Sequence, residues 1–174
     1  MKFNEDVPNH LKDLFYPEQL TLWGIRIWSD GYRQNYSPYA TLREAYQRAK
    51  CFNGLMALDN LLTLIISGHS RAVDIRCPCC GGISDDEWRI LQAIALVQAG
   101  KEEKVPQLIS HFLEPATVRV AQSGIVSWAQ ELSDRSLVLP LRPWALHQVE
   151  PNYAAAEKRA SFRVITNPSK TVLH

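Results

Sequence analysis

Three of the chain's four cysteines lie within four consecutive positions, in the segment CPCCGG at residues 77–82. Cysteine thiolates bind soft metal ions and exchange disulfide bonds, so this segment is where the sequence could do chemistry. The three cysteines lie too close together to join distant segments, which argues against the disulfide framework of a secreted protein. In a reducing compartment we expect thiols or metal ligands here.

The order C-P-x-C-G in this segment resembles half of a zinc-ribbon knuckle. The resemblance implies that Cys77 and Cys80 grip one ion, while the glycine lets backbone N–H groups turn toward sulfur. Zinc binds four ligands in a tetrahedron, and the chain has no second C-x-x-C motif. The remaining ligands would come from Cys51 or His69, or from a second chain. We therefore predict a possible zinc site of Cys77, Cys80, Cys51 and His69, with Cys79 pointing elsewhere and no other cofactor.

The same segment also allows a redox interpretation. Cys80 lies four residues before Ser84, which has the sequence signature of a helix start. The partial positive charge of a helix N-terminus lowers the pKa of a nearby thiol and favours the thiolate. Acidic residues at positions 85–87 oppose that effect, and the βαβ pattern expected of a thioredoxin-like motif is missing. A third interpretation is that the cysteines are reduced, partly buried packing residues in a tight turn.

Outside this segment the sequence carries no recognisable catalytic motif. The five histidines are scattered, and there is no H-E-x-x-H, P-loop, G-x-G-x-x-G or G-x-S-x-G pattern. The formal net charge is +1, which gives no electrostatic reason to expect binding to nucleic acid or to an anionic membrane. The longest strongly apolar run, residues 61–66, is too short to span a bilayer, and the N-terminus lacks the apolar run of a signal peptide. We expect a cytoplasmic protein.

Aromatic and basic residues interleave between residues 23 and 46. Such a pattern is compatible with stacking on the bases of a single-stranded nucleic acid. The nearly neutral net charge instead favours core aromatics beside a solvated basic face. Arg26, in this stretch, lies between apolar residues. We expect it to pair with Asp59 or Asp74, or to extend its charge to solvent.

Hydrophobic periodicity predicts helices along most of the chain. The first covers residues 18–35. Thr41 and Glu44 form a capping box, in which the hydroxyl and the carboxylate each accept a free backbone N–H. This capping box predicts the start of a long second helix that ends near Gly68. Because the polar face almost disappears after Phe52, we expect the C-terminal half of this helix to be buried.

A second capping box, Ser84 with Glu87, predicts the start of a third helix. This helix is apolar almost all round, so it should lie at the centre of the core. A fourth helix follows with Pro106 in its first turn, and a fifth begins at Pro115. The sequence therefore predicts an all-α, single-domain helical bundle of about five helices.

The expected bundle domain comprises residues 1–141, with an irregular lead-in at residues 1–17. Residues 142–174 contain few apolar anchors and several prolines. This composition predicts an irregular C-terminal tail that is flexible or loosely docked on the bundle.

These observations lead to three hypotheses of function. The leading one is a cytoplasmic, non-enzymatic regulatory or adaptor protein that binds another protein or a second copy of itself, with no nucleic acid or membrane as partner. The alternative is a zinc-binding or thiol-redox-responsive protein that uses the cysteine turn. The third is an enzyme whose site the sequence does not reveal. An apolar groove would favour the first, converged sulfurs the second, and a deep pocket with perturbed titratable groups the third.

Overall fold

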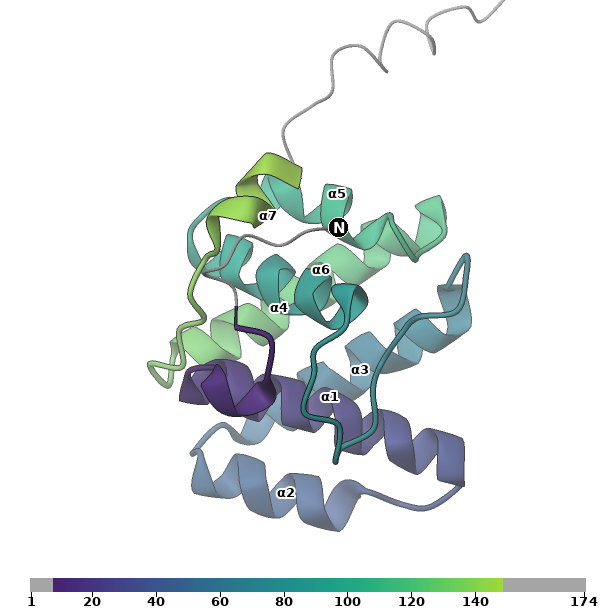
Figure 1. The fold of residues 1–174 in the computed structure, drawn as a ribbon, viewed down its shortest axis with the longest axis vertical. Helices are drawn as coiled ribbons and strands as arrows, with labels where there is room; N and C mark the ends of the chain where they lie inside the picture. Colours follow the sequence, from purple (N-terminus) through teal and green to yellow (C-terminus); the bar gives the residue numbers. More distant parts are fainter. Residues whose placement is uncertain (1–7, 149–174) are drawn as a thin grey trace, which may run out of the picture.

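A computed structural model describes residues 8–148 of the chain, and within this range every regular element is helical (Figure 1). The all-α prediction is therefore confirmed, although the described residues form more helices than the expected five. The α-helices are α1 (Tyr16–Gln34), α2 (Tyr39–Arg48), α3 (Phe52–Gly68), α4 (Asp85–Gln98), α5 (Val105–Ile109), α6 (Pro115–Ser133) and α7 (Pro143–Gln148). Two short 3₁₀ helices, η1 (Leu11–Asp13) and η2 (Glu102–Lys104), precede α1 and α5.

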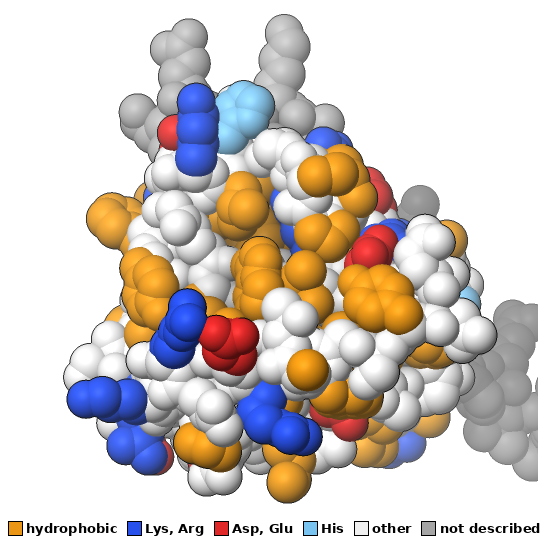
Figure 2. All heavy atoms as spheres, turned by 90° about the horizontal axis from the view of Figure 1, so that it is seen from below, with side chains coloured by type: hydrophobic (Ala, Val, Ile, Leu, Met, Phe, Trp, Pro, Cys, Tyr) orange, Lys and Arg blue, Asp and Glu red, His pale blue; other side chains and the backbone are white. Residues whose placement is uncertain are grey.

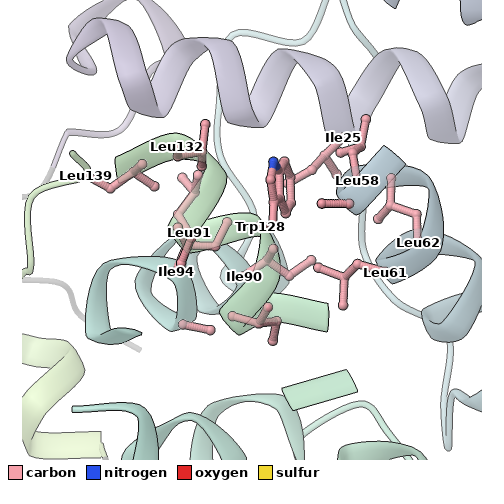
Figure 3. Close-up of a cluster of buried hydrophobic side chains, with 14 of the residues drawn as sticks. Ile25, Leu58, Leu61, Leu62, Ile90, Leu91, Ile94, Trp128, Leu132 and Leu139 are labelled. Carbon is pink, nitrogen blue, oxygen red and sulfur yellow. The ribbon is translucent and has the colours of Figure 1, made fainter. Parts of the chain in front are cut away.

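The core lies where α1, α3, α4 and α6 meet, and Figure 3 shows their apolar side chains gathered around Trp128. Ten of the 14 residues of α4 are buried, including Leu91 and Ile94, which have no exposed surface. Helix α6 packs on both α3 and α4. The apolar pattern of α4 therefore predicted its central place correctly.

The long second helix predicted from Thr41 is in fact two helices. The first begins at Tyr39 with Pro38 at the N-cap, so Thr41 and Glu44 lie inside α2 and form no capping box. It ends where Lys50 takes a left-handed backbone conformation, with φ of +55°. The N–H groups of Lys50 and Cys51 then bond to the carbonyls of Gln47 and Tyr46, both at 2.9 Å. This is a Schellman motif, which usually has glycine at the left-handed position, so a lysine there concealed the helix end.

Two glycines in α1 make room for the chain that follows it. A Cβ on Gly24 would lie 2.8 Å from the Tyr46 hydroxyl, and one on Gly31 would lie 2.7 Å from the Pro38 ring. Both distances are shorter than carbon atoms tolerate. Glycine lowers the helix propensity of α1 at these two positions. Its missing side chain, however, permits the close approach of α2 to α1.

The described part of the expected tail packs on the bundle. Arg142 forms an ion pair with Glu18 at 2.9 Å and lies 5.6 Å from the centre of the Trp88 ring, and Ala145 is completely buried. Contacts with the bundle thus continue past residue 141. The rest of the predicted tail, residues 149–174, lies outside the described residues, as do residues 1–7 of the lead-in. None of the helices within residues 8–148 has the length and apolarity needed to cross a membrane.

Candidate functional site

The segment between α3 and α4, residues 70–84, is the cysteine loop. It passes across α1 before it returns to the bundle at α4 (Figure 1). Its first residue is fixed by a hydrogen bond from the Ser70 N–H to the Phe112 carbonyl at 2.9 Å. Its second residue, Arg71, pairs with Asp86 at 2.7 Å. The cysteines therefore lie on a loop whose beginning is attached to two parts of the bundle.

Arg26 of α1 holds the other end of the loop. Its guanidinium pairs with Glu87 through two hydrogen bonds of 2.7 and 2.9 Å. The same group donates to the carbonyls of Cys80 and Gly82, at 2.5 and 2.6 Å. The side chains of Arg26 and Glu87 are both fully buried. One buried cation therefore fixes the backbone immediately after the cysteines.

Glu87 links this pair to the start of α4. Its carboxylate accepts the Ser84 N–H at 2.9 Å, and the Ser84 hydroxyl accepts the Glu87 N–H at 3.1 Å, so the predicted capping box is confirmed. The carboxylate also accepts the Arg76 N–H at 3.0 Å. Capping, charge pairing and loop attachment therefore depend on one buried side chain.

The expected partners of Arg26 were wrong. The carboxylate of Asp59 instead accepts hydrogen bonds from the Trp28 indole at 2.7 Å and from the Tyr39 hydroxyl. The backbone carbonyl of Asp74 accepts the Ser84 hydroxyl. The sequence did not indicate Glu87 as a partner, because the capping box already accounts for an acidic residue at this position. No local signal connects it with Arg26, which is 61 residues away.

The three sulfur atoms of Cys77, Cys79 and Cys80 lie within 4.8 Å of one another. Cys77 and Cys80 form a disulfide across a tight turn, in which the Cys80 N–H bonds to the Cys77 carbonyl at 3.0 Å. The structure thus has a disulfide at these two positions, where thiols or metal ligands are expected in a reducing compartment. Cys79 keeps its thiol and is exposed. Its sulfur lies 3.2 Å from that of Cys77, so it joins the cluster instead of pointing away from it.

The structure does not bring the other two predicted zinc ligands to this cluster. Cys51 is the N-cap of α3 and His69 is its C-cap, so they lie at opposite ends of a 17-residue helix, about 27 Å apart. Cys51 is completely buried, and burial raises the pKa of its thiol. The Nδ1 atom of His69 is 2.8 Å from the Ile66 carbonyl.

A different histidine lies beside the cysteine loop. His10 forms an antiparallel bridge with Gly82, and the next residue, Leu11, donates its N–H to the Gly81 carbonyl at 2.8 Å. A Cβ on Gly81 would lie only 3.1 Å from Nδ1 of His10, so the absence of a side chain at Gly81 leaves the imidazole against the loop backbone. Sequence reasoning missed His10 because nothing in the lead-in indicates where it packs.

Two basic side chains also lie close to the backbone of the cysteine turn. Arg26 contacts the carbonyls on either side of Gly81, and a Cβ on Gly82 would lie 2.6 Å from a guanidinium nitrogen of Arg76. The acidic residues that opposed thiolate formation in the sequence are largely neutralised. Glu87 pairs with Arg26, and Asp86 pairs with arginines at positions 71 and 89. Two of the three acidic residues at the start of α4 are therefore engaged with arginines rather than facing the cysteines unpaired.

The same loop forms one wall of an apolar groove between α1 and α3, with a volume of about 250 Å³. Its apolar lining consists of Trp28, Tyr32, Leu62, Ile65, Ile66, Val73 and Ile75. Tyr32 is 63% exposed, and further exposed hydrophobic side chains lie on α2 and α3. Figure 2 shows the face of the molecule that carries α2, where hydrophobic side chains form patches among Lys and Arg.

No protein-family model, no curated protein and no solved structure matches the chain. The site itself is therefore the basis for an inference of function.

Proposed function

We propose that this chain is a thiol-redox-responsive protein, whose switch is the Cys77–Cys80 disulfide with Cys79 as a neighbouring third sulfur. The observation that carries the proposal is the convergence of three sulfurs, of which two are bonded and one is an exposed thiol. Each sulfur is close enough to a second one to exchange with it after modest motion of the side chains.

The attachment of the loop supports a reversible switch. The backbone around both bonded cysteines is held by hydrogen bonds that do not involve sulfur. Arg76 donates its N–H to Glu87, while Arg26 donates to the Cys80 carbonyl. Reduction of the disulfide therefore leaves the two cysteines close together, so the bond can form again without a large movement of the backbone.

The chemistry requires a dithiol as reductant. A thiolate of that dithiol attacks one sulfur of the Cys77–Cys80 bond and forms a mixed disulfide, and the other cysteine leaves as a thiolate and takes up a proton. The second thiol of the reductant then resolves the mixed disulfide. Two electrons pass to the protein, which gains two thiols, and the reductant becomes a disulfide. In the oxidised protein, the Cys79 thiolate can instead attack Cys77 and release Cys80, without net redox change.

Thiol counting tests this proposal. The protein is equilibrated with mixtures of oxidised and reduced dithiothreitol, the thiols are alkylated, and the labelled cysteines are identified by mass spectrometry. We expect two thiols, Cys51 and Cys79, in the oxidised denatured chain and four in the reduced chain, with unchanged helical circular dichroism. The variant Cys79→Ser should retain the Cys77–Cys80 bond but lose exchange to Cys77–Cys79. Loss of the fold on reduction, or no reduction below the unfolding transition, would contradict a switch.

A second candidate function is an adaptor that binds another protein through the groove between α1 and α3. The observation in its favour is the apolar lining of that groove, with Tyr32 largely exposed at its edge. Exposed apolar surface in a concave site is typical of protein-binding surfaces.

Two substitutions of exposed tyrosines on α1 test this second candidate. Tyr32→Asp places a charge in the groove, whereas Tyr16→Asp is a matched control outside it, since Tyr16 is 58% exposed. Sedimentation equilibrium measures self-association. A photo-crosslinking residue at position 32 identifies another partner, whose affinity is then measured with both purified proteins. We expect Tyr32→Asp alone to weaken the complex. Equal effects of the two variants would argue against the adaptor function. So would a protein that stays monomeric and forms no complex with any crosslinked partner once both are purified.

A further inference from the structure

We propose that the reduced cysteine loop binds one zinc ion through Cys77, Cys79 and Cys80, with the imidazole of His10 as the fourth ligand. This inference rests on the proposed reversible reduction of the Cys77–Cys80 bond. It differs from the ligand set suggested by the sequence, because Cys51 and His69 lie elsewhere in the fold.

The spacing of the sulfurs fits a tetrahedral ion. Zinc–sulfur bonds are about 2.3 Å long, so two thiolates on one zinc lie about 3.8 Å apart. The sulfur of Cys79 is 3.2 Å from that of Cys77, and all three sulfurs lie within 4.8 Å of one another. Reduction of the disulfide lets its two sulfurs separate from their bonded distance toward the required spacing. The adjustment among the sulfurs is therefore confined to cysteine side chains.

His10 packs against the cysteine loop through its backbone and its ring. Its ring nitrogens lie outside the group formed by the three sulfurs, so zinc binding requires His10 to move toward them. Its backbone is paired with Gly82, and its Nδ1 faces Gly81, directly after Cys80. Among residues 8–148, no protein hydrogen bond occupies either nitrogen of this ring, whereas Nδ1 of His69 lies at hydrogen-bond distance from the Ile66 carbonyl. Three cysteines with one histidine form an established ligand set for structural zinc.

The charge around the loop suits this ligand set. Three thiols lose three protons when they bind zinc, which leaves a site with one net negative charge. Arg26 is bonded to the Cys80 carbonyl, and the guanidinium of Arg76 lies beside Gly82. The charge of Arg76 favours thiolates electrostatically, while Arg26, whose charge is balanced by Glu87, fixes the Cys80 carbonyl. Arg26 is held in place by Glu87 with or without the ion, so the cation is already positioned when the metal arrives.

Metal analysis of the full chain tests the inference. Protein reduced without oxygen is given zinc, desalted in the presence of a competing chelator, and analysed for metal and for free thiols. Cobalt(II) replaces zinc in a parallel sample, because its absorption reports tetrahedral geometry and the number of thiolate ligands. We expect one zinc per reduced chain, a tetrahedral cobalt spectrum with three thiolates, and no retention by the oxidised protein.

Four variants distinguish the ligands. Cys79→Ser and His10→Ala should lose zinc to a chelator that leaves the wild type loaded, and Cys79→Ser should also reduce the thiolate-to-cobalt absorption. The controls His69→Ala and Cys51→Ser should retain the ion, with circular dichroism confirming that every variant is folded. Retention by His10→Ala would overturn the assignment of the fourth ligand, and retention by Cys79→Ser would overturn the three-cysteine site.

The outcomes also separate this inference from the proposed switch. If the wild type shows four thiols but retains no metal, the zinc site is wrong and the switch stands. If the disulfide resists reduction in the folded protein, both are wrong. If zinc binds equally well to a variant with all three loop cysteines replaced by serine, the metal is bound adventitiously and the site is again wrong.

Discussion

Helix α1 holds the cysteine loop through two arginines in very different surroundings. Arg26 and Arg33 are seven residues apart, which is two turns, so they lie on the same side of the helix. Both donate hydrogen bonds to loop carbonyls, Arg26 to Cys80 and Gly82, and Arg33 to Ile75 at 2.6 Å. Arg26 is fully buried and paired with a carboxylate, whereas Arg33 is exposed and bonds only to carbonyls.

The two arginines differ both in burial and in the number of hydrogen bonds, four for Arg26 and two for Arg33, and we expect burial to decide what each contributes to stability. Water replaces the bonds of an exposed arginine when the side chain is removed. The Glu87 carboxylate beside Arg26 is fully buried, so water does not replace its lost partner. Arg71 is intermediate, since its side chain is 44% exposed while its partner Asp86 is buried. The same substitution at the three positions therefore forms a graded series.

The largest effect is expected for Arg26→Met. The change leaves the Glu87 carboxylate buried without its cation and removes the donor from two loop carbonyls. Breaking a buried ion pair in this way costs about 3–5 kcal/mol of unfolding free energy. Urea denaturation followed by circular dichroism measures the change. If Arg26→Met lowers the unfolding free energy as little as Arg33→Met does, the cysteine loop rearranges to compensate for the lost arginine.

Arg71→Met should have an intermediate effect of about 1–2 kcal/mol, because hydrogen bonds to a charged group are lost while the arginine is partly solvated. Asp86 keeps its contact with Arg89 at 2.9 Å, which limits the cost. The same denaturation measurement applies. A cost as large as that of Arg26→Met would mean that Arg89 does not compensate.

The contribution of Arg71 should depend on pH. Burial alone would raise the pKa of Asp86, but hydrogen bonds from Arg71 and from the Asp74 N–H, with the charge of Arg89, hold that pKa below its usual value. A depressed carboxyl pKa adds stability above the unfolded value of about 3.9, and this stability is lost as the pH falls through the folded pKa. The difference in unfolding free energy between wild type and Arg71→Met should therefore shrink in acid. A constant difference from pH 7 to pH 3 would exclude Asp86 as the titrating group.

The smallest effect is expected for Arg33→Met. Its bonds to the Ile75 and Arg76 carbonyls lie at the surface, where water can replace them, so the unfolding free energy should change by less than about 0.5 kcal/mol. This variant is also the matched control for Arg26→Met, since helix, loop and substitution are the same. A cost above 1 kcal/mol would show that exposure does not explain the difference between the two arginines.

Features that depend on near neighbours in the sequence were predictable. The Ser84–Glu87 capping box and the central place of α4 follow from a few consecutive residues. The turn at Lys50 that follows α2 also depends on local geometry, but lysine is an unusual residue for a left-handed position. The pairing of Arg26 with Glu87 and the packing of His10 on Gly81 join distant segments, and no periodic pattern encodes them. The cysteine cluster was therefore found from the sequence, while its surroundings were not.

The separation of Arg26 from Glu87 has a consequence for synthesis of the chain. The two residues are 61 positions apart, so at ~5–20 residues per second the ribosome needs about 3–12 seconds to make the partner after Arg26. During this interval the guanidinium lacks the Glu87 carboxylate that accompanies it into the interior of the finished protein, so we expect it to stay in water. We expect α1 to remain undocked until the start of α4 has emerged, although α1 is made before every other described α-helix of the bundle.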